Sequence, residues 1–145
     1  MVQIGVAVVG TGFGGKVHIP GLQAHHRTEV VAVWNRDRAN AQQVADQNNI
    51  PSASDSLADI LSSDSVQAVT LATPPFAHYD MAKDIIRAGK HLLLEKPITL
   101  AVEEAEHLQQ LAADHNVIVI PDLEYRVIPE RQHFAELLNQ DIVGK

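Results

Sequence analysis

Apolar and polar residues alternate along the chain in blocks that predict strands and helices in turn. Largely apolar runs, typical of strands buried on both faces, occupy residues 4–9, 29–34, 66–72, 91–94 and 117–120. A short third strand is expected at residues 50–53. The segments between and after them have the spacing or composition of helices, at residues 16–25, 37–48, 55–61, 76–88, 101–115 and 129–139. This alternation calls for right-handed βαβ units. We therefore expect an α/β fold in which a doubly wound, mostly parallel six-stranded sheet carries helices on both faces.

Single residues refine the ends of these elements. Pro20 lies inside the first helical segment, so we expect irregular turns there, because proline has no backbone N–H to donate. Ser54 is the expected N-cap of the segment 55–61, and Gly89 is expected to end the helix before it.

The composition is that of an ordinary globular domain, and it excludes several functions. The chain has 145 residues, of which 46% are apolar and 20% charged, and it has no cysteine. A formal net charge of −7 repels phosphate backbones, so we expect no nucleic-acid partner. No apolar run approaches the roughly 20 residues of a membrane span, and the N-terminus does not resemble a secretory signal. We therefore expect a cytoplasmic protein. We also expect no bound metal, because the sequence places no ligand-like partners beside the histidines His25, His26, His107, His115 and His133.

A glycine-rich loop follows the first strand. Gly10, Gly12 and Gly15 form the pattern Gly-x-Gly-x-x-Gly between a buried strand and a helix, as in a dinucleotide-binding Rossmann fold. There the first glycine permits a tight turn, the second lets the backbone approach the pyrophosphate, and the third lets the helix pack close to the strand. By the pattern alone, an ordinary loop or the nucleotide site of a methyltransferase stays open. We interpret the whole loop as cofactor-binding, namely Gly10, Thr11, Gly12, Phe13, Gly14 and Gly15.

The end of the second strand bears on the choice between NAD and NADP. An NAD enzyme often places a carboxylate there to bind the adenosine ribose, whereas this chain has the neutral Asn35. Arg36 can stack on adenine and pair with a 2′-phosphate, and Arg38 adds positive charge. The alternative is that both arginines are solvated and Asp37 binds the ribose. We favour NADP(H) as the cofactor, with NAD(H) possible.

Two further segments follow the predicted strands 66–72 and 91–94, where ligands of open α/β sheets bind. The first contains Ala72, Thr73, Pro74 and His78, and the second contains Glu95, Lys96 and Pro97. Lys96 precedes a proline, so it lies in extended backbone at the end of a buried strand. A lysine held there can exchange a proton or bind a hydroxyl, although an exposed lysine at a strand end is the commoner case.

Together these segments resemble the glucose–fructose oxidoreductase, inositol dehydrogenase and rhizopine catabolism family. The resemblance rests on residues 10–18, 72–78 and 89–97, of which the Glu-Lys-Pro of Glu95 to Pro97 is the most specific. It implies NAD(P)-dependent alcohol–carbonyl chemistry on sugars, cyclitols or related compounds, with Lys96 as the catalytic residue near the nicotinamide. It also implies a cis Lys96–Pro97 bond, which a tertiary amide permits, and it makes Glu124 and Arg126 weaker site candidates.

The resemblance further predicts the domain organisation. Residues 1–121 are expected to form the Rossmann domain, and residues 122–145 a crossover helix and the start of a substrate domain that this chain lacks. We therefore expect the chain to bind cofactor without turnover, the small-molecule substrate to bind through the missing domain, and the parent enzyme to be a homo-oligomer. A non-catalytic NAD(P)-sensing or regulatory module is the alternative.

Overall fold

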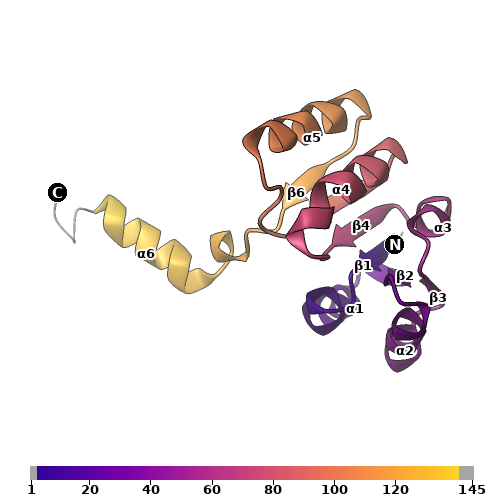
Figure 1. Cartoon of the computed structure of the whole chain (residues 1–145). Coiled ribbons are helices and arrows are strands. Elements are labelled where there is room, and N and C mark those ends of the chain that lie inside the picture. Colours follow the sequence, from indigo (N-terminus) through magenta and orange to yellow (C-terminus); the bar gives the residue numbers. More distant parts are fainter. Residues whose placement is uncertain (1–2, 141–145) are drawn as a thin grey trace.

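The structure is a computed structural model that describes residues 3–140, and its centre is a six-stranded sheet (Figure 1). The strand order is β3-β2-β1-β4-β5-β6, and every neighbouring pair is parallel. The expected Rossmann fold is thus confirmed, with a sheet that is wholly parallel. The strands are β1 (Ile4–Val9), β2 (Thr28–Trp34), β3 (Ser52–Ser54), β4 (Ala68–Leu71), β5 (His91–Leu94) and β6 (Val119–Pro121).

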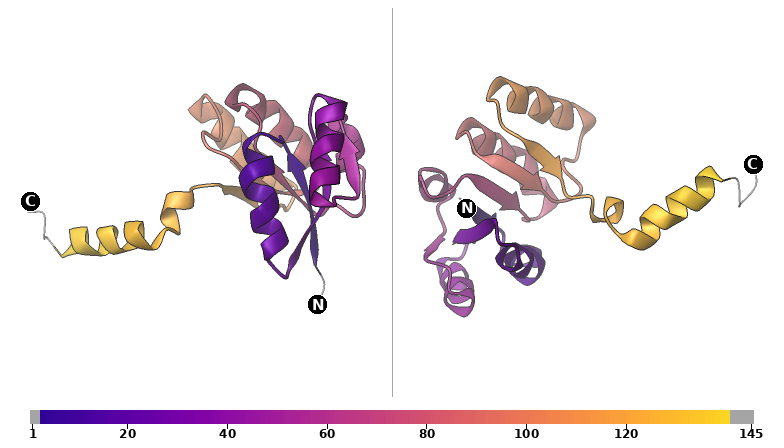
Figure 2. Two further views of the ribbon diagram at one scale, coloured as in Figure 1. Left: turned by 90° about the horizontal axis from the view of Figure 1, so that it is seen from below. Right: turned by 180° about the vertical axis from the view of Figure 1, so that it is seen from behind.

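Helices cover both faces of the sheet because βαβ units alternate around the topological switch between β1 and β4. On one face, α1 (Ile19–Ala24) and α2 (Arg38–Asn48) pack on β1, β2 and β3 through Ile19, Ala41 and Ala45. On the other face, α3 (Leu57–Leu61), α4 (His78–Arg87) and α5 (Val102–Asp114) pack on a second apolar core. Figure 2 shows the two layers from below and from behind. Within residues 3–140, no helix has the length and apolarity that crossing a membrane requires.

The segment after the glycine loop departs from a regular helix. Residues Gly14–His18 form a π-helical turn, η1, in which the Ile19 N–H donates to the Gly14 carbonyl, and α1 begins only at Ile19. The irregularity expected from Pro20 is confirmed, since this residue stands in the first turn of α1 and has no N–H to donate.

The expected cap of the third helix was wrong. The Asp59 N–H donates to Ser56 Oγ at 3.2 Å, so Ser56 caps α3, whereas Ser54 is buried at the end of β3. A serine at 54 pairs with β2 and is too far from the first turn, because α3 begins at Leu57.

The carboxyl ends of all six strands meet at one edge because the sheet is parallel. The loops after β1, β2, β4, β5 and β6 gather there, including the short helices η2 (Pro75–Ala77) and η3 (Glu124–Arg126). The last helix, α6 (Pro129–Asn139), extends away from the sheet (Figures 1 and 2), and none of its residues is buried. The expected first strand of a further domain, at residues 142–145, lies outside the described residues.

Candidate dinucleotide site

A cavity of about 410 Å³ opens at the carboxyl edge between β1, β2 and β4. The glycine loop forms one wall, the residues after β2 form another, and the loop after β4 forms the third. The predicted site residues that line it are Gly10, Thr11, Gly12, Asn35, Arg36, Ala72, Thr73 and Pro74. Four lining residues that sequence reasoning had not assigned are Trp34, Phe76, Ala77 and Met81. Phe76 and Ala77 lie in the segment 72–78 that carries the family resemblance, whereas Trp34 and Met81 belong to no motif. The meeting of β2, η2 and α4 brings all four to the cavity.

The glycines of the loop have different steric reasons for lacking a side chain. Gly10 has φ +102°, and a Cβ there would lie 2.5 Å from the Ala72 carbonyl oxygen. Gly12 faces open space, with no atom within 4 Å of an added Cβ. The packing role expected of Gly15 belongs instead to Gly14, whose Cβ would lie 2.9 Å from Val8 Cγ1. At Gly15 an added Cβ would meet only ordinary contacts at 3.8 Å and beyond, because η1 turns this residue away from β1.

The residues present fit a dinucleotide. Gly12 leaves its backbone uncovered on the cavity side, which is what a pyrophosphate needs in order to approach peptide N–H groups. Two buried polar atoms at the cavity, Thr73 Oγ1 and Trp34 Nε1, have no hydrogen-bond partner among the described residues. Such atoms are rare in folded proteins, and a polar ligand would satisfy them.

The residues after β2 are held by a chain of hydrogen bonds. Asn35 Nδ2 donates to Thr11 Oγ1 at 2.5 Å, and Asn35 Oδ1 accepts the Asp37 N–H. Asp37 is the N-cap of α2, because its Oδ1 accepts the N–H groups of Ala39 and Asn40. Its carboxylate is therefore engaged in the helix cap, whereas Arg36 lines the cavity.

Arg38 lies apart from the two cavities of the carboxyl edge. It is the first residue of α2 and lines a separate hollow with Ser52, Ser54 and Asp59. Of the two arginines predicted to meet the cofactor, the structure brings only Arg36 to the larger cavity.

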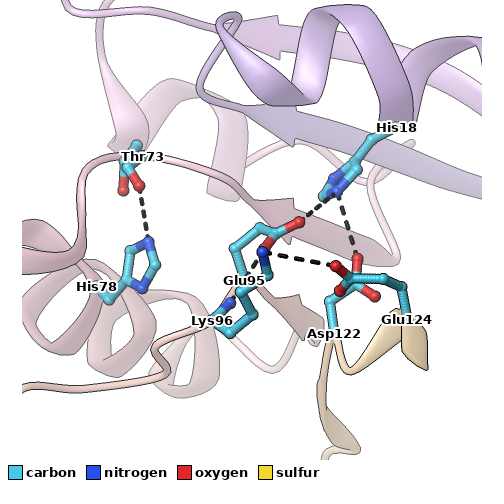
Figure 3. Close-up of polar contacts among 7 residues, drawn as sticks. All are labelled: His18, Thr73, His78, Glu95, Lys96, Asp122 and Glu124. Atoms are coloured by element: carbon cyan, nitrogen blue, oxygen red, sulfur yellow. Dashed lines mark hydrogen bonds and ion pairs between the residues drawn. The ribbon is translucent and has the colours of Figure 1, made fainter. Parts of the chain in front are cut away.

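A second cavity, of about 200 Å³, lies next to the first and contains the predicted catalytic residue. Phe13, Ala72, Thr73, Pro75, Glu95 and Lys96 line it. The Lys96 side chain is 52% exposed, and its Nζ lies 3.5 Å from Glu124 Oε1 (Figure 3). The Lys96–Pro97 bond is cis, as the resemblance implied.

His78 lies outside both cavities. It is buried, with 1% of its surface exposed, and its ring is held by two carbonyl oxygens at 2.8 Å. Nδ1 faces the oxygen of Pro97 and Nε2 faces that of Thr73, the contact drawn in Figure 3. His78 therefore joins the loop after β4 to the loop after β5 from inside the protein, rather than facing the cavity.

A cluster of three ionisable residues, His18, Glu95 and Asp122, was not foreseen as such. Their donor atoms lie within 4.8 Å of one another, a geometry that can hold a metal ion, and the absence of a metal stays a prediction. Burial raises the pKa of the Asp122 carboxyl above its ordinary value, the Glu95 carboxylate raises it further, and His18 opposes both. His18 and Glu95 lie 77 residues apart, so their contact could not be read from spacing.

The chain matches a family model described as an oxidoreductase family with an NAD-binding Rossmann fold, over residues 4–123. An uncharacterized oxidoreductase of Synechocystis sp. is 54% identical over 140 residues, which are 97% of this chain and 38% of that protein. The NADP⁺-dependent D-xylose 1-dehydrogenase 2 of Haloferax volcanii is 34% identical over 136 residues, 93% of this chain and 42% of that protein. The chain therefore spans less than half the length of these relatives.

Two solved structures share this architecture. The 3-ketoreductase KijD10 of Actinomadura kijaniata, in complex with NADP, superposes with a TM-score of 0.92 at 26% identity, covering 99% of this chain and 46% of that one. GenD2 from gentamicin A biosynthesis, in complex with NAD, has a TM-score of 0.79 at 33% identity, covering 83% and 34%. The chain belongs to the NAD(P)-dependent oxidoreductase family of glucose–fructose oxidoreductase, inositol dehydrogenase and the rhizopine catabolism proteins, and it contains that family's Rossmann domain.

Proposed function

We propose that this chain binds NADP(H) in preference to NAD(H), as the cofactor-binding domain of an oxidoreductase that acts on a sugar, a cyclitol or a related alcohol or carbonyl compound. The observation that carries the proposal is the uncovered backbone of Gly12 beside a cavity of about 410 Å³. Gly10 to Gly15 would hold the pyrophosphate, and the loop after β2 would hold the adenosine half.

The contacts after β2 support the preference for NADP(H). Asp37, the carboxylate that would otherwise bind the ribose hydroxyls, is engaged by two backbone N–H groups of α2. The neutral Asn35 side chain does not repel a 2′-phosphate, and the guanidinium of Arg36 is at the cavity to pair with one.

The smaller cavity supports a role for Lys96 in the reaction. A nicotinamide cofactor, when bound, supplies or accepts a hydride. Lys96 would hold or transfer a proton at the oxygen of the reacting carbon, because its ammonium group is half-exposed at the wall of this cavity. Glu124, 3.5 Å from the ammonium group, would orient Lys96 before substrate binds.

The segment after residue 121 supports a second domain that contains the substrate pocket. From β6 onward, large apolar side chains are exposed, a pattern typical of a surface that packs against further protein. They are Leu123, Tyr125, Val127, Phe134 and Leu138. We propose that residues 1–121 bind the cofactor, that residues 122–145 lead into the substrate domain, and that this chain alone does not turn over substrate. The homo-oligomeric state of the enzyme and its cytoplasmic location stay predictions from the sequence.

The test is a fluorescence or calorimetric titration of the chain with NADPH and with NADH. We expect NADPH to bind at least tenfold more tightly, since a charged hydrogen bond contributes about 1.5–3 kcal/mol. Arg36→Ala should remove that difference and leave NADH binding nearly unchanged. Arg87→Ala, in the last turn of α4, is the matched control.

Three outcomes contradict separate parts of the proposal. Equal affinities for the two nucleotides, unaffected by Arg36→Ala, would remove the NADP(H) preference. Failure of both to bind at millimolar concentration would remove the cofactor site itself. Turnover of a sugar or keto compound by the chain with NADPH would show that no second domain is needed.

A further inference from the structure

The loops after β4 and β5 form two walls of the smaller cavity, beyond the point where the two strands stop pairing. The last backbone hydrogen bond between these segments runs from the Glu95 N–H to the Leu71 carbonyl oxygen, at 3.0 Å. Among the described residues, no backbone hydrogen bond joins residues 72–78 to residues 96–98. The sheet itself therefore does not fix the separation of the two walls.

The ring of His78 makes the connection that the sheet does not. Its Nε2 lies 2.8 Å from the Thr73 carbonyl oxygen (Figure 3), and its Nδ1 lies 2.8 Å from the Pro97 carbonyl oxygen. An imidazole with one ring proton donates to one of these oxygens in either tautomer and stays in contact with the other. Because His78 is 1% exposed, water cannot take over these contacts when the ring is removed.

The ring is carried by an element that the core holds in place. His78 is the first residue of α4, and this helix is anchored by Ala82, Ile85 and Ile86, which are fully buried. A side chain on a packed helix is positioned more precisely than one on a loop. The two loops are thus referred to the core through one side chain.

The two carbonyl groups belong to residues at the walls of the site. Thr73 lines both cavities, and its buried Oγ1 has no hydrogen-bond partner among the described residues. Pro97 directly follows Lys96, which lines the smaller cavity. A misplacement of about 1 Å at a reacting group can cost roughly a hundredfold in rate. The distance between these two walls therefore matters for any reaction in the cavity.

We propose that His78 is a positioning residue that sets the separation of Thr73 and Lys96 across the smaller cavity. It acts from inside the protein, through the backbone on both sides, and fixes the place of the lysine relative to the nicotinamide. The inference rests on the proposed function in that Lys96 is taken as the reacting lysine and the nicotinamide as the occupant of this cavity.

The experiment replaces the two ring nitrogens one at a time, in the ¹⁵N-labelled chain without cofactor. The side-chain amide of asparagine overlays Nδ1 and keeps the contact with Pro97, whereas that of the longer glutamine overlays Nε2 and keeps the contact with Thr73. We expect His78→Asn to shift the Thr73 amide resonance and to leave that of Lys96 nearly in place. His78→Gln should do the reverse, and His78→Leu, which keeps neither contact, should shift both resonances.

Ile85→Val is the matched control, because it removes one buried carbon from the same helix and touches neither loop contact. It should lower the urea midpoint and leave both amide resonances in place. A general loss of stability is thereby separated from a loss of positioning. Circular dichroism confirms that each variant folds, and the pair of His78→Asn and His78→Gln decides the question even if His78→Leu does not fold.

A titration with NADPH supplies the second measurement. His78→Gln should bind NADPH as the parent chain does, whereas His78→Asn should bind it roughly threefold to tenfold more weakly, the size of one ordinary hydrogen bond. The inference is wrong if His78→Asn and His78→Gln shift the two amide resonances alike, if folded His78→Leu shifts neither, or if His78→Asn binds NADPH unchanged. Failure of the parent chain to bind NADPH would instead remove the proposed cofactor site, and the amide resonances would still decide the role of His78.

Discussion

Two glycines in the same loop, Gly12 and Gly14, should respond oppositely to one added methyl group. The Cβ of Gly14→Ala would lie 2.9 Å from Val8 Cγ1 and 3.3 Å from the Cβ of Ala72. The Cβ of Gly12→Ala would have no protein atom within 4 Å, and the Gly12 backbone is outside the left-handed region. We therefore predict that Gly14→Ala destabilises the fold, whereas Gly12→Ala leaves the fold intact and weakens cofactor binding.

The magnitudes follow from these distances. Carbon atoms pack at about 3.5–4.0 Å, so η1 or β1 must move by roughly 0.6 Å or more in Gly14→Ala. Overpacking of this kind costs about 1–3 kcal/mol, and the better helix propensity of alanine returns up to about 1 kcal/mol. The expected loss for Gly14→Ala is about 1–2 kcal/mol of unfolding free energy, because Val8 is fully buried in a central strand. Gly12→Ala should gain roughly 0.4–1 kcal/mol, by restricting the unfolded chain.

The assay measures stability and binding on the same proteins. Urea unfolding is followed by circular dichroism, and NADPH binding by quenching of Trp34, the chain's single tryptophan, which lines the larger cavity. Gly14→Ala should lower the urea midpoint. Gly12→Ala should raise its midpoint slightly but bind NADPH at least tenfold more weakly, a loss of about 1.4 kcal/mol or more, because the methyl group occupies the space into which the pyrophosphate must come.

The reasoning is refuted if the two variants exchange their effects. Unchanged NADPH affinity in Gly12→Ala would mean that the pyrophosphate does not approach this backbone. Unchanged stability in Gly14→Ala would mean that η1 moves away from Val8 at no cost. Gly15→Ala is the control for stability, because its added Cβ would meet only ordinary contacts at 3.8 Å and beyond.

Two further predictions follow from other contacts. Asp37→Ala should cost about 1 kcal/mol of unfolding free energy in urea, because α2 loses its N-cap. The variant should bind NADH as tightly as the parent chain. A tenfold drop in NADH affinity would instead identify Asp37 as the ribose ligand. Asp122→Asn tests the raised pKa of Asp122. The protonated Asp122 carboxyl contributes stability that is fully present below its ordinary pKa of 3.8, and this stability is lost as the pH rises through the higher pKa of the folded state. Because asparagine does not titrate, the unfolding free energy of Asp122→Asn in urea should increase relative to that of the parent chain from pH 4 to pH 7. If the difference in unfolding free energy between the two proteins stays constant over this range, the pKa of Asp122 is not raised.

Much of the fold could be predicted because each strand is encoded locally. A run such as residues 4–9 has no polar position on either face, as is typical of a strand buried between two layers of helices. The ends of elements were harder, as Ser54 shows. Whether that serine ends a strand or caps a helix depends on its pairing with β2, which is a tertiary contact.

The candidate site was predictable wherever it consists of a motif on one loop. The glycine loop and the Glu95–Pro97 segment each signal their place by local chemistry at a strand end. The sequence does not tell which way the first turn of α4 faces, so the burial of His78 against two backbone carbonyl oxygens could only be seen in the structure. The contact of His18 with Glu95 and Asp122 requires three chain segments to meet, and neither carboxylate has a local signal for it.

By itself, the sequence determined the order of strands and helices, the edge of the sheet at which chemistry takes place, and the residue types available there. Periodicity and backbone preference act over a few residues, so they can be read from the chain directly. The tertiary structure alone decided which glycine packs against Val8, that the Asp37 carboxylate caps a helix, and that a buried imidazole lies between two carboxylates. These are contacts across large separations in sequence, and their energies depend on distances and burial that exist only once the sheet has formed.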